Sequence, residues 1–300
     1  MSREQTLLPS AVEAIGNTPL VDLSRLTREV DGRIVAKLEF LNPGYSKKDR
    51  IARQMIEDAE VQGLLNPGQS VIELTSGNTG TGLAITCAAK GYHFIAVMSR
   101  GNSMERARMM EALGAEVVLV DQLPESTPGQ VSGGDLALVN ETAKALVIER
   151  NAFRADQFEL EGSRRAHYLH TGPEILQQAT HIDAFCDFVG SGGSFGGCAK
   201  FFKEQTADIH CYVVEPAGAA ALQGQPVTNP NHRIQGGGYA LSDLTLIDKS
   251  LVDGYLTVTD QEALEMARRL AREEGLFAGF SAGANVAAAM QLLKTKHVGQ

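Results

Sequence analysis

The sequence predicts an α/β protein with two open, twisted, mostly parallel sheets that are flanked by helices. Short apolar runs alternate with amphipathic stretches along the chain, which is typical of βαβ units with parallel strands. This alternation occurs twice, on either side of a polar stretch at 122–134 that contains two prolines and three glycines and is interpreted as a surface loop. The 300 residues suit two domains that share a cleft.

In the first half of the chain, three apolar runs predict strands, and two amphipathic stretches predict the helices that connect them. The strands are expected at 70–74, 94–98 and 117–120, and the helices at 80–90 and 103–113. Gly114 is a typical helix stop. The order βαβαβ implies parallel strands with right-handed crossovers.

The second half repeats this alternation. Strands are expected at 184–189, 210–214 and 256–259, and helices at 195–204, at 260–274 and from about Ser281 onward. Asp260 is predicted to cap the second of these helices. The last helix consists almost entirely of small and apolar residues, so it should be buried.

The composition argues against several classes of function. A formal net charge of -9 disfavours nucleic acid or an anionic membrane as the main partner. No apolar run approaches the ~20 residues that span a bilayer, and the polar N-terminus lacks the apolar core of a signal peptide. The cysteines lack C-x-x-C spacing, which predicts free thiols and a cytosolic protein: Cys87, Cys186, Cys198 and Cys211.

Three segments are rich in glycine and hydroxyl side chains: Thr75–Gly80, Gly190–Gly197 and Gly279–Ala284. The first two lie between a predicted strand and a predicted helix, where backbone N–H groups at the positive helix end favour a carboxylate or a phosphate. An ordinary capped turn is the alternative for the first segment. The Asn78 amide could hold a ring oxygen, and Ser281 is either a helix cap or a hydrogen-bonding partner of a heterocyclic nitrogen.

Other interpretations find weaker support. A dinucleotide-binding fingerprint requires glycine where this chain has Phe195, although Glu215 ends the next strand roughly where a ribose-binding acid would lie. A Walker A loop is excluded because no Gly-Lys-Ser/Thr follows the glycines. His167 and His170 have no convincing third ligand, so no metal site is predicted. No G-x-S-x-G elbow supports serine hydrolase chemistry.

Two adjacent lysines, Lys47 and Lys48, lie at a predicted strand-to-helix turn. An amine in this place can form a Schiff base with a carbonyl cofactor. Most lysine pairs are solvated surface charge, so the pair gains meaning only together with the other segments.

Taken in order, five segments resemble the cysteine synthase / cystathionine β-synthase family, the fold-type II pyridoxal-phosphate enzymes, whose fold is like that of the tryptophan synthase β subunit. They are Ile15–Leu20, Lys37–Arg50, Thr75–Gly80, Gly190–Ser194 and Gly279–Gly283. The resemblance covers nearly the whole chain. It implies one catalytic unit at 10–293, with a smaller mobile sub-domain at 41–152 and a larger cofactor domain made of 1–40 and 153–300. It also implies a homodimer.

The resemblance implies a role for each motif residue. Lys48, directly before Asp-Arg, would be the catalytic lysine that holds pyridoxal 5′-phosphate, and Asn78 would hold the 3′ oxygen. Ser281 would be the partner of the pyridine nitrogen. The phosphate loop would comprise Gly190, Ser191, Gly192, Gly193 and Ser194. The substrate carboxylate would be bound by Thr75, Ser76, Gly77, Thr79 and Gln157.

The activity that the resemblance implies is β-replacement on L-serine, O-acetylserine or O-phosphoserine through an aminoacrylate. A sulfur nucleophile, giving L-cysteine or a thioether amino acid, is the leading hypothesis. The alternatives are an amine nucleophile that gives a diaminopropionate-type product, a serine/threonine dehydratase, a nucleotide-binding regulatory protein that uses Glu215, and a non-catalytic scaffold.

The chain departs from the family pattern where the second substrate should enter. Lys47 replaces an apolar residue, and the segments at 100–102, 122–134, 159–165 and 235–239 differ from the usual motifs. Gly190-Ser191 replaces the usual Gly-Thr, which is a small change. Arg164 and Arg165 are interpreted as a charge pair at a helix start, with contact to an anionic co-substrate as the alternative. These departures leave the predicted cofactor site intact and leave the nucleophile open.

Overall fold

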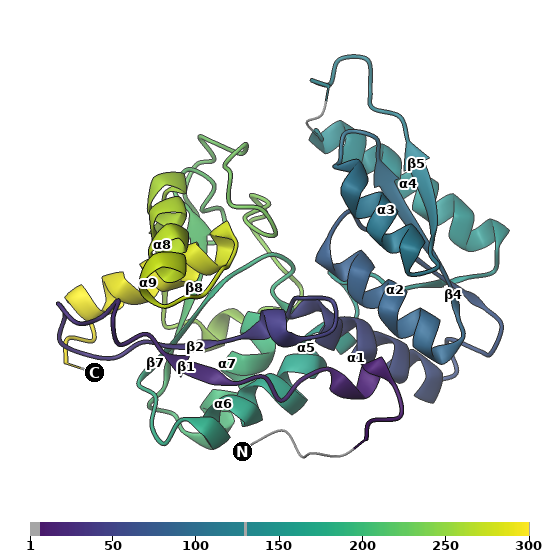
Figure 1. The fold of residues 1–300 in the computed structure, drawn as a ribbon. Coiled ribbons are helices and arrows are strands. Elements are labelled where there is room, and N and C mark those ends of the chain that lie inside the picture. Colours follow the sequence, from purple (N-terminus) through teal and green to yellow (C-terminus); the bar gives the residue numbers. More distant parts are fainter. Residues whose placement is uncertain (1–6, 129–130, 300) are drawn as a thin grey trace. The chain divides into compact units, whose positions relative to one another are not determined.

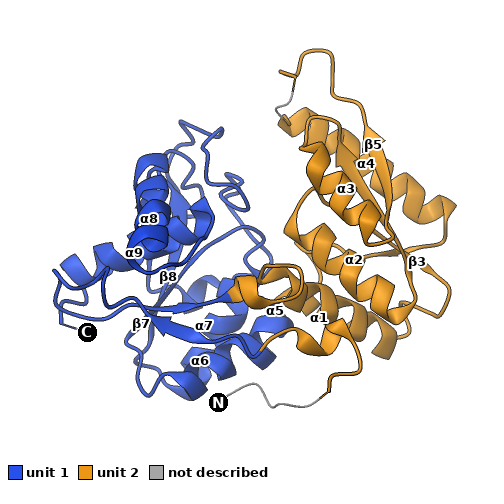
Figure 2. Ribbon diagram, in the orientation of Figure 1, with its two compact units in different colours: residues 1, 17–38, 164–300 blue, residues 2–16, 39–163 orange. Residues whose placement is uncertain are grey.

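The computed structural model describes residues 7–128 and 131–299 (Figure 1). The chain divides into two compact units (Figure 2). Among the described residues, one unit comprises 7–16 and 39–163, and the other comprises 17–38 and 164–299. The assignment of a mobile role to one part of the chain stays a prediction.

The unit around residues 39–163 contains a parallel four-stranded sheet in the order β5-β4-β3-β6. Its strands are β3 (Ser70–Leu74), β4 (His93–Ser99), β5 (Glu116–Val120) and β6 (Phe153–Arg154). The first three confirm the strands predicted in this half. The short β6, which follows the last helix of this sheet, was not predicted.

The helices of this unit are α1 (Lys48–Val61), α2 (Asn78–Lys90), α3 (Met104–Ala112) and α4 (Gly133–Glu149), with single turns η1 (Ala11–Ala14) and η2 (Glu39–Leu41). Helix α4 packs on the sheet through Val139 and Ala143, which share a buried cluster with Ile72, Ile95 and Val97. The N-cap Ser132 and the third helical residue Asp135 form a reciprocal capping box that starts α4.

Two predictions in this unit need correction. Helix α2 begins at Asn78 and not at Gly80, because Gly77 is the N-cap, so Asn78 and Thr79 belong to its first turn. The predicted loop at 122–134 ends at Ser132, and Gly133 and Gly134 already belong to α4. Residues 129–130 of that loop lie outside the described residues.

The other unit contains a parallel sheet in the order β7-β8-β9 and a separate antiparallel pair, β1-β2. The strands are β1 (Leu20–Asp22), β2 (Val35–Lys37), β7 (Ala184–Phe188), β8 (His210–Pro216) and β9 (Gly254–Val258). The helices are α6 (Gly172–Gln178), α7 (Gly193–Gln205), α8 (Asp260–Glu273) and α9 (Phe280–Thr295). The short α5 (Gly162–Ala166) begins in the first unit and ends in this one. The π-helix η3 (His167–Thr171) and the single turn η4 (Lys249–Leu251) complete this unit.

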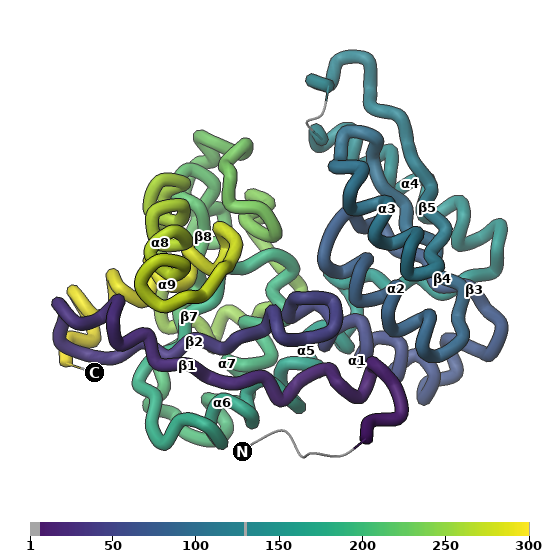
Figure 3. Tube along the Cα trace, viewed as in Figure 1, coloured from purple at the N-terminus to yellow at the C-terminus, as the bar shows by residue number. Residues whose placement is uncertain are grey.

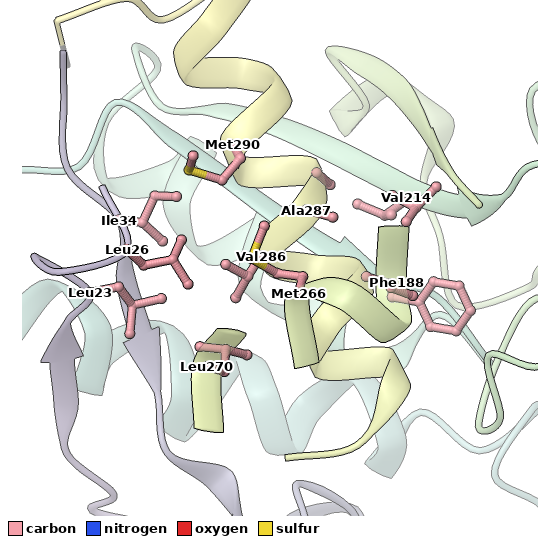
Figure 4. Close-up of a cluster of buried hydrophobic side chains, with 14 of the residues drawn as sticks. Leu23, Leu26, Ile34, Phe188, Val214, Met266, Leu270, Val286, Ala287 and Met290 are labelled. Carbon is pink, nitrogen blue, oxygen red and sulfur yellow. The ribbon is translucent and has the colours of Figure 1, made fainter. Parts of the chain in front are cut away.

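The core of this unit joins segments from both ends of the chain. The trace in Figure 3 runs from the purple β1 and β2 to the yellow-green α8 and yellow α9. Figure 4 shows Leu23, Leu26 and Ile34 in the same buried cluster as Leu270 of α8 and Val286 of α9. Most of the small apolar residues of α9 are buried, which confirms the prediction for the last helix.

The start of α8 corrects a further prediction. Its N-cap is Thr259, which forms a capping box with Glu262, whereas Asp260 is the first helical residue. Asp260 instead accepts a hydrogen bond from the backbone N–H of Arg233 at 2.9 Å. The cysteines Cys87, Cys186, Cys198 and Cys211 are free thiols. Within residues 7–128 and 131–299, no helix is long and apolar enough to cross a membrane.

Candidate active site

Lys48 is the first residue of helix α1. Its backbone N–H donates to the Ser46 hydroxyl at 3.1 Å, which fixes the turn that enters the helix. Both Lys47 and Lys48 are half-buried, so neither is a fully solvated surface charge. Lys47 is the N-cap position and has helical backbone angles.

The residue after Lys48 anchors this turn. Asp49 is fully buried, and one carboxylate oxygen accepts the backbone N–H of Gly44 at 2.5 Å. Burial raises the pKa of Asp49 to about 6, against the lowering effect of the Gly44 hydrogen bond. Gly44 itself has no room for a side chain, because an added Cβ would lie 2.4 Å from Oδ1 of Asp49.

Arg50 forms the second anchor of the same turn. Its guanidinium donates from Nε at 2.6 Å and from Nη2 at 2.8 Å to the two carboxylate oxygens of Glu39. The Arg50 side chain is 2% exposed, and two parallel charge-assisted bonds are the geometry that makes such a buried pair favourable. The Lys48-Asp49-Arg50 sequence therefore positions the lysine by means of two buried neighbours.

The first turn of α2 presents several polar groups. The N–H of Gly80 donates to the Thr75 hydroxyl at 2.9 Å, which closes the loop. Arg106 of α3 donates to the Ser76 carbonyl at 3.1 Å. Asn78 is exposed, and in the described part of the chain its side-chain amide has no hydrogen-bond partner. Backbone N–H groups at this helix end favour an anion.

Two predicted substrate residues that are far apart in the sequence meet at this helix. The hydroxyl of Thr79 donates to Oε1 of Gln157 at 2.7 Å. This bond fixes the Gln157 amide, and among the described residues its Nε2 donates to no group. Because Nε2 can donate only, a carboxylate would suit it.

A buried acid lies behind Gln157. Glu73 is 1% exposed, and its carboxyl accepts a hydrogen bond from the backbone N–H of Gln157. Arg154 approaches it, with 3.5 Å between Nε and Oε2. Burial and the nearby Asp156 raise the pKa of Glu73 to about 8, against the lowering effect of Arg154.

Close packing of α1 and α2 brings Lys48 and Asn78 to neighbouring helix ends. A Cβ added to Gly82 would lie 3.0 Å from the Lys48 carbonyl oxygen and 3.1 Å from Cα of Asp49. Asn78 is one turn before Gly82 on the same face of α2. Within this unit, the backbone of Lys48 therefore packs against α2 one helical turn from Asn78.

The other unit holds the predicted phosphate loop at the N-terminus of α7. Gly192 is the N-cap with a φ of 86°, a left-handed conformation that favours glycine. Gly190 packs against a neighbouring loop, because an added Cβ would lie 2.7 Å from the Gly236 carbonyl oxygen. Ser191 is buried, and the Ser194 hydroxyl donates to Asp187.

Ser281 lies inside helix α9, in the same unit. The N-cap of α9 is Gly279, so the interpretation of Ser281 as a simple cap is wrong. Its side chain is half-buried, and within the described residues its hydroxyl has no hydrogen-bond partner. Asn285, one turn further along α9, accepts the backbone N–H of Phe188 at 2.5 Å, which ties this helix to the strand before Gly190.

The loop at 235–239 packs against the predicted phosphate loop. The N–H of Gly238 donates to the Val189 carbonyl at 2.9 Å. A small hollow beside Gly190 is lined in part by Glu215 and Tyr239. The buried Glu215 accepts the backbone N–H groups of Leu222 at 2.9 Å and Gln223 at 3.0 Å, so its carboxylate holds a loop. This weakens the interpretation of Glu215 as a ribose-binding acid.

Each of the two units, taken by itself, holds groups of the kinds that a phosphorylated pyridine requires. The unit with α7 offers the backbone N–H groups at the start of α7, after the glycine turn at Gly190 and Gly192, which suit a phosphate. It also offers the Ser281 hydroxyl, which has no hydrogen-bond partner among the described residues. The unit with α1 offers an amine at Lys48 and the amide of Asn78, which has no hydrogen-bond partner in the described part of the chain. Each of these groups is of the type that the predicted cofactor requires.

Comparison with known proteins agrees with this chemistry. The family model "Pyridoxal-phosphate dependent enzyme" matches residues 12–300, and the chain belongs to this family. Pyridoxal phosphate is therefore its cofactor, as predicted.

Within the family, the chain is similar to cysteine synthases. It is 41% identical over 294 residues to cysteine synthase 3 of Caenorhabditis elegans, with 97% of this chain and 83% of the relative covered. A solved hydrogen sulfide-producing enzyme of Fusobacterium nucleatum is 38% identical, with a TM-score of 0.86 and coverage of 97% and 92%. A solved O-ureido-L-serine synthase is 35% identical, with a TM-score of 0.85 and coverage of 97% and 88%. These matches confirm the predicted fold class and a cysteine synthase-like enzyme.

Sequence reasoning missed the residues that support the motifs. Glu73 and Asp187 are acids within otherwise apolar strand runs, and this is a signal that could have found them. Arg106 gave no such signal, because its contact with Ser76 joins different elements. Arg164 and Arg165 lie in a segment that departs from the family pattern. Arg165 is exposed. Arg164 packs against α7, because its Cδ would lie 3.5 Å from a Cβ added to Gly196.

The two histidines with H-x-x-H spacing lie in different surroundings. His167 is buried and bonds through Nδ1 to the Thr171 hydroxyl at 2.9 Å, and His170 is exposed. In the part of the chain that the structure describes, no group of three or more His, Cys, Asp or Glu residues could hold a metal ion.

Proposed function

We propose that this enzyme catalyses β-replacement on an L-serine derivative (O-acetylserine, O-phosphoserine or serine) with a sulfur nucleophile, giving L-cysteine or a thioether amino acid. The bond between Thr79 and Gln157 carries this proposal, because it orients an amide donor at the N-terminus of α2, where an amino-acid carboxylate would bind. The similarity to cysteine synthase 3 supports the sulfur nucleophile.

The proposed roles follow from the chemistry of each group. Lys48 Nζ would hold the cofactor covalently and, after the amino acid displaces it, remove the α proton. The Asn78 amide would bind the 3′ oxygen, and Gly190–Ser194 the phosphate. When bound, pyridoxal phosphate supplies an electron sink for the charge that develops at the α carbon. Ser281 would donate a hydrogen bond to the ring nitrogen.

The identity of Ser281 also bears on the reaction type. A serine hydroxyl is too weak an acid to protonate a pyridine nitrogen, so the ring would stay neutral. A neutral ring withdraws electrons less strongly than a protonated one. Elimination and replacement at the β carbon should therefore be favoured over transamination.

The donor and the nucleophile can be identified in one series of absorption measurements. Purified enzyme loaded with pyridoxal phosphate should absorb visible light, and only the true donor should change the spectrum. Sulfide added next should restore the original spectrum and release an amino acid that mass spectrometry identifies as cysteine. A protein that stays colourless with added cofactor would refute the proposal.

A second candidate nucleophile follows from the similarity to O-ureido-L-serine synthase. Formation of that product by β-replacement would take hydroxyurea through its hydroxyl oxygen. The same spectral series with hydroxyurea in place of sulfide decides between the two. If hydroxyurea restores the spectrum and sulfide does not, the sulfur nucleophile is wrong, whereas the proposed cofactor and donor chemistry remains.

The choice between the two adjacent lysines is tested separately. Borohydride reduction of the loaded enzyme followed by peptide mapping should place the pyridoxyl group on Lys48. Lys48→Ala should lose the covalent label and lower kcat by about 10³-fold or more, and the matched Lys47→Ala should keep the label. A pyridoxyl group on Lys47 would refute the assignment.

A further inference from the structure

Asp187 is a buried acid beside the proposed phosphate loop. It lies near the carboxyl end of β7, three residues before Gly190, and is 6% exposed. Its sequence neighbours Cys186 and Phe188 are apolar. Burial of a carboxyl group is costly unless hydrogen-bond donors satisfy it. Asp187 therefore requires donors from the elements that pack around it.

Ser194 supplies such a donor. It is the second residue of α7, and its hydroxyl donates to Oδ2 of Asp187. A serine hydroxyl carries a single proton and two acceptor lone pairs. While that proton is donated to Asp187, the hydroxyl cannot donate it to a phosphate bound at the same helix end.

We infer that Asp187 is a positioning residue that weakens phosphate binding by holding the hydroxyl proton of Ser194. This inference rests on the proposed phosphate loop at Gly190–Ser194. The loop then binds phosphate through backbone N–H groups rather than through the Ser194 hydroxyl. The acid and a phosphate compete for one proton, and at close range in a poorly solvated site two negative groups also repel each other.

The chain thus gives up part of the affinity that a serine at a helix N-terminus could provide. Ser194 remains part of the loop, but its hydroxyl donates its hydrogen bond to Asp187 and not to the phosphate. The inference predicts that removal of the acid, and not of the serine, changes the affinity for the phosphate group.

Asp187→Asn tests this directly, because the amide has the same shape and can donate to the Ser194 oxygen. The serine proton is then available to the phosphate, so the dissociation constant of pyridoxal phosphate should fall about tenfold. Affinity is measured by titration of cofactor-free enzyme, followed by visible absorption. Pyridoxal, which lacks the phosphate, should bind the wild type and the variant with equal affinity. If the variant were merely less well folded, its affinities for pyridoxal and for pyridoxal phosphate would change together.

Asp183→Asn is the matched control. Asp183 precedes β7 at the end away from the loop and accepts a hydrogen bond from His181 at 2.8 Å. This variant removes the same formal charge and should leave the dissociation constant of pyridoxal phosphate within about twofold of the wild-type value.

Ser194→Ala gives an independent test if Asp187→Asn fails to fold. It should change the dissociation constant by less than about twofold, since the lost hydroxyl was not donated to the phosphate. A tenfold loss of affinity in Ser194→Ala, or unchanged affinity in a folded Asp187→Asn, would overturn the inference while the proposed cofactor site stands. A wild-type protein that binds no pyridoxal phosphate would instead refute the proposed site itself.

Discussion

At the scale of single residues, Glu73 is a buried acid that contacts the predicted substrate-binding residue Gln157 and should make stability depend on pH. Its buried carboxyl accepts a hydrogen bond from the backbone N–H of Gln157. The side-chain oxygen of Gln157 in turn accepts a hydrogen bond from the Thr79 hydroxyl. The groups that set its charge are Arg154, which favours ionisation, and burial together with Asp156, which oppose it. The pKa of about 8 lies well above the ordinary value of 4.5.

The sign of the pH dependence follows from this difference. Between about pH 4.5 and pH 8, the native state holds a proton on Glu73 that the unfolded chain has released. The contribution of Glu73 to the free energy of unfolding is therefore fully present below pH 4.5 and lost as pH rises through 8. Glu73→Gln, which does not titrate, should reduce the fall in stability across this window.

Urea unfolding followed by circular dichroism at several pH values measures this effect. Glu141→Gln, at an exposed side chain of α4, is the control and should keep the wild-type slope. Equal slopes in wild type and Glu73→Gln would show that the Glu73 carboxyl is ionised in the native state at neutral pH.

At the scale of elements, the contact between α1 and α2 positions Lys48. Gly82→Val would force side-chain atoms into the Lys48 carbonyl and Ala52, which a Cβ already approaches to 3.0 and 3.1 Å. Overpacking of this kind costs about 1–3 kcal/mol. The helices should separate at the end that carries Lys48, so borohydride labelling of Lys48 should also slow.

Ala88→Val is the control for this variant, because Ala88 is exposed on the same helix. It introduces the same β-branched side chain without a steric clash, and its cost in helix propensity is about 0.5 kcal/mol. Comparing the melting temperatures of the two variants separates the cost of the steric clash at Gly82 from the cost in helix propensity. A similar melting temperature for both would mean that α1 and α2 adjust easily at Gly82.

The elements also show what the sequence could predict. Apart from the two-residue β6, the strands of both parallel sheets were predicted within one or two residues, because buried parallel strands appear as continuous apolar runs. Helix starts were less accurate, since a cap depends on side-chain geometry: Asp260 was chosen although Thr259 accepts the bond from Glu262. Helix α4 was not predicted; its first residues, Gly133 and Gly134, resemble a loop.

The same distinction between local sequence patterns and contacts formed on folding applies to the candidate site. Lys48, Asn78 and Ser281 could be selected from motifs because each lies in a short recognisable segment. Their supports could not, because Glu73 meets Gln157 and Arg106 meets Ser76 only after folding. Contacts between distant segments leave no periodic pattern in the sequence.

At the scale of the whole molecule, the proposed cofactor residues belong to both compact units. Lys48 and Asn78 are in one unit, and Gly190–Ser194 and Ser281 are in the other. A ligand that binds only the native state raises its stability by mass action, by about 2.7 kcal/mol at a free concentration one hundredfold above the dissociation constant. Pyridoxal phosphate should therefore raise the melting temperature.

A variant in one unit should affect chemistry at a residue of the other. Gly190→Val places a side chain where a Cβ would lie 2.7 Å from the Gly236 carbonyl oxygen, which must displace the proposed phosphate loop. We expect the affinity for pyridoxal phosphate to fall about tenfold or more and labelling of Lys48 at subsaturating cofactor to fall with it.

Gly133→Ala is the matched control, since an added Cβ there meets nothing within 4 Å; its affinity for pyridoxal phosphate and its Lys48 labelling should equal those of the wild type. Full labelling of Lys48 in a folded Gly190→Val protein at the same cofactor concentration would show that the loop at Gly190 does not hold the phosphate. The lysine and the loop would then serve different ligands. Reduced labelling that recovers at saturating cofactor would instead mean that the residues of both units act on one molecule of pyridoxal phosphate.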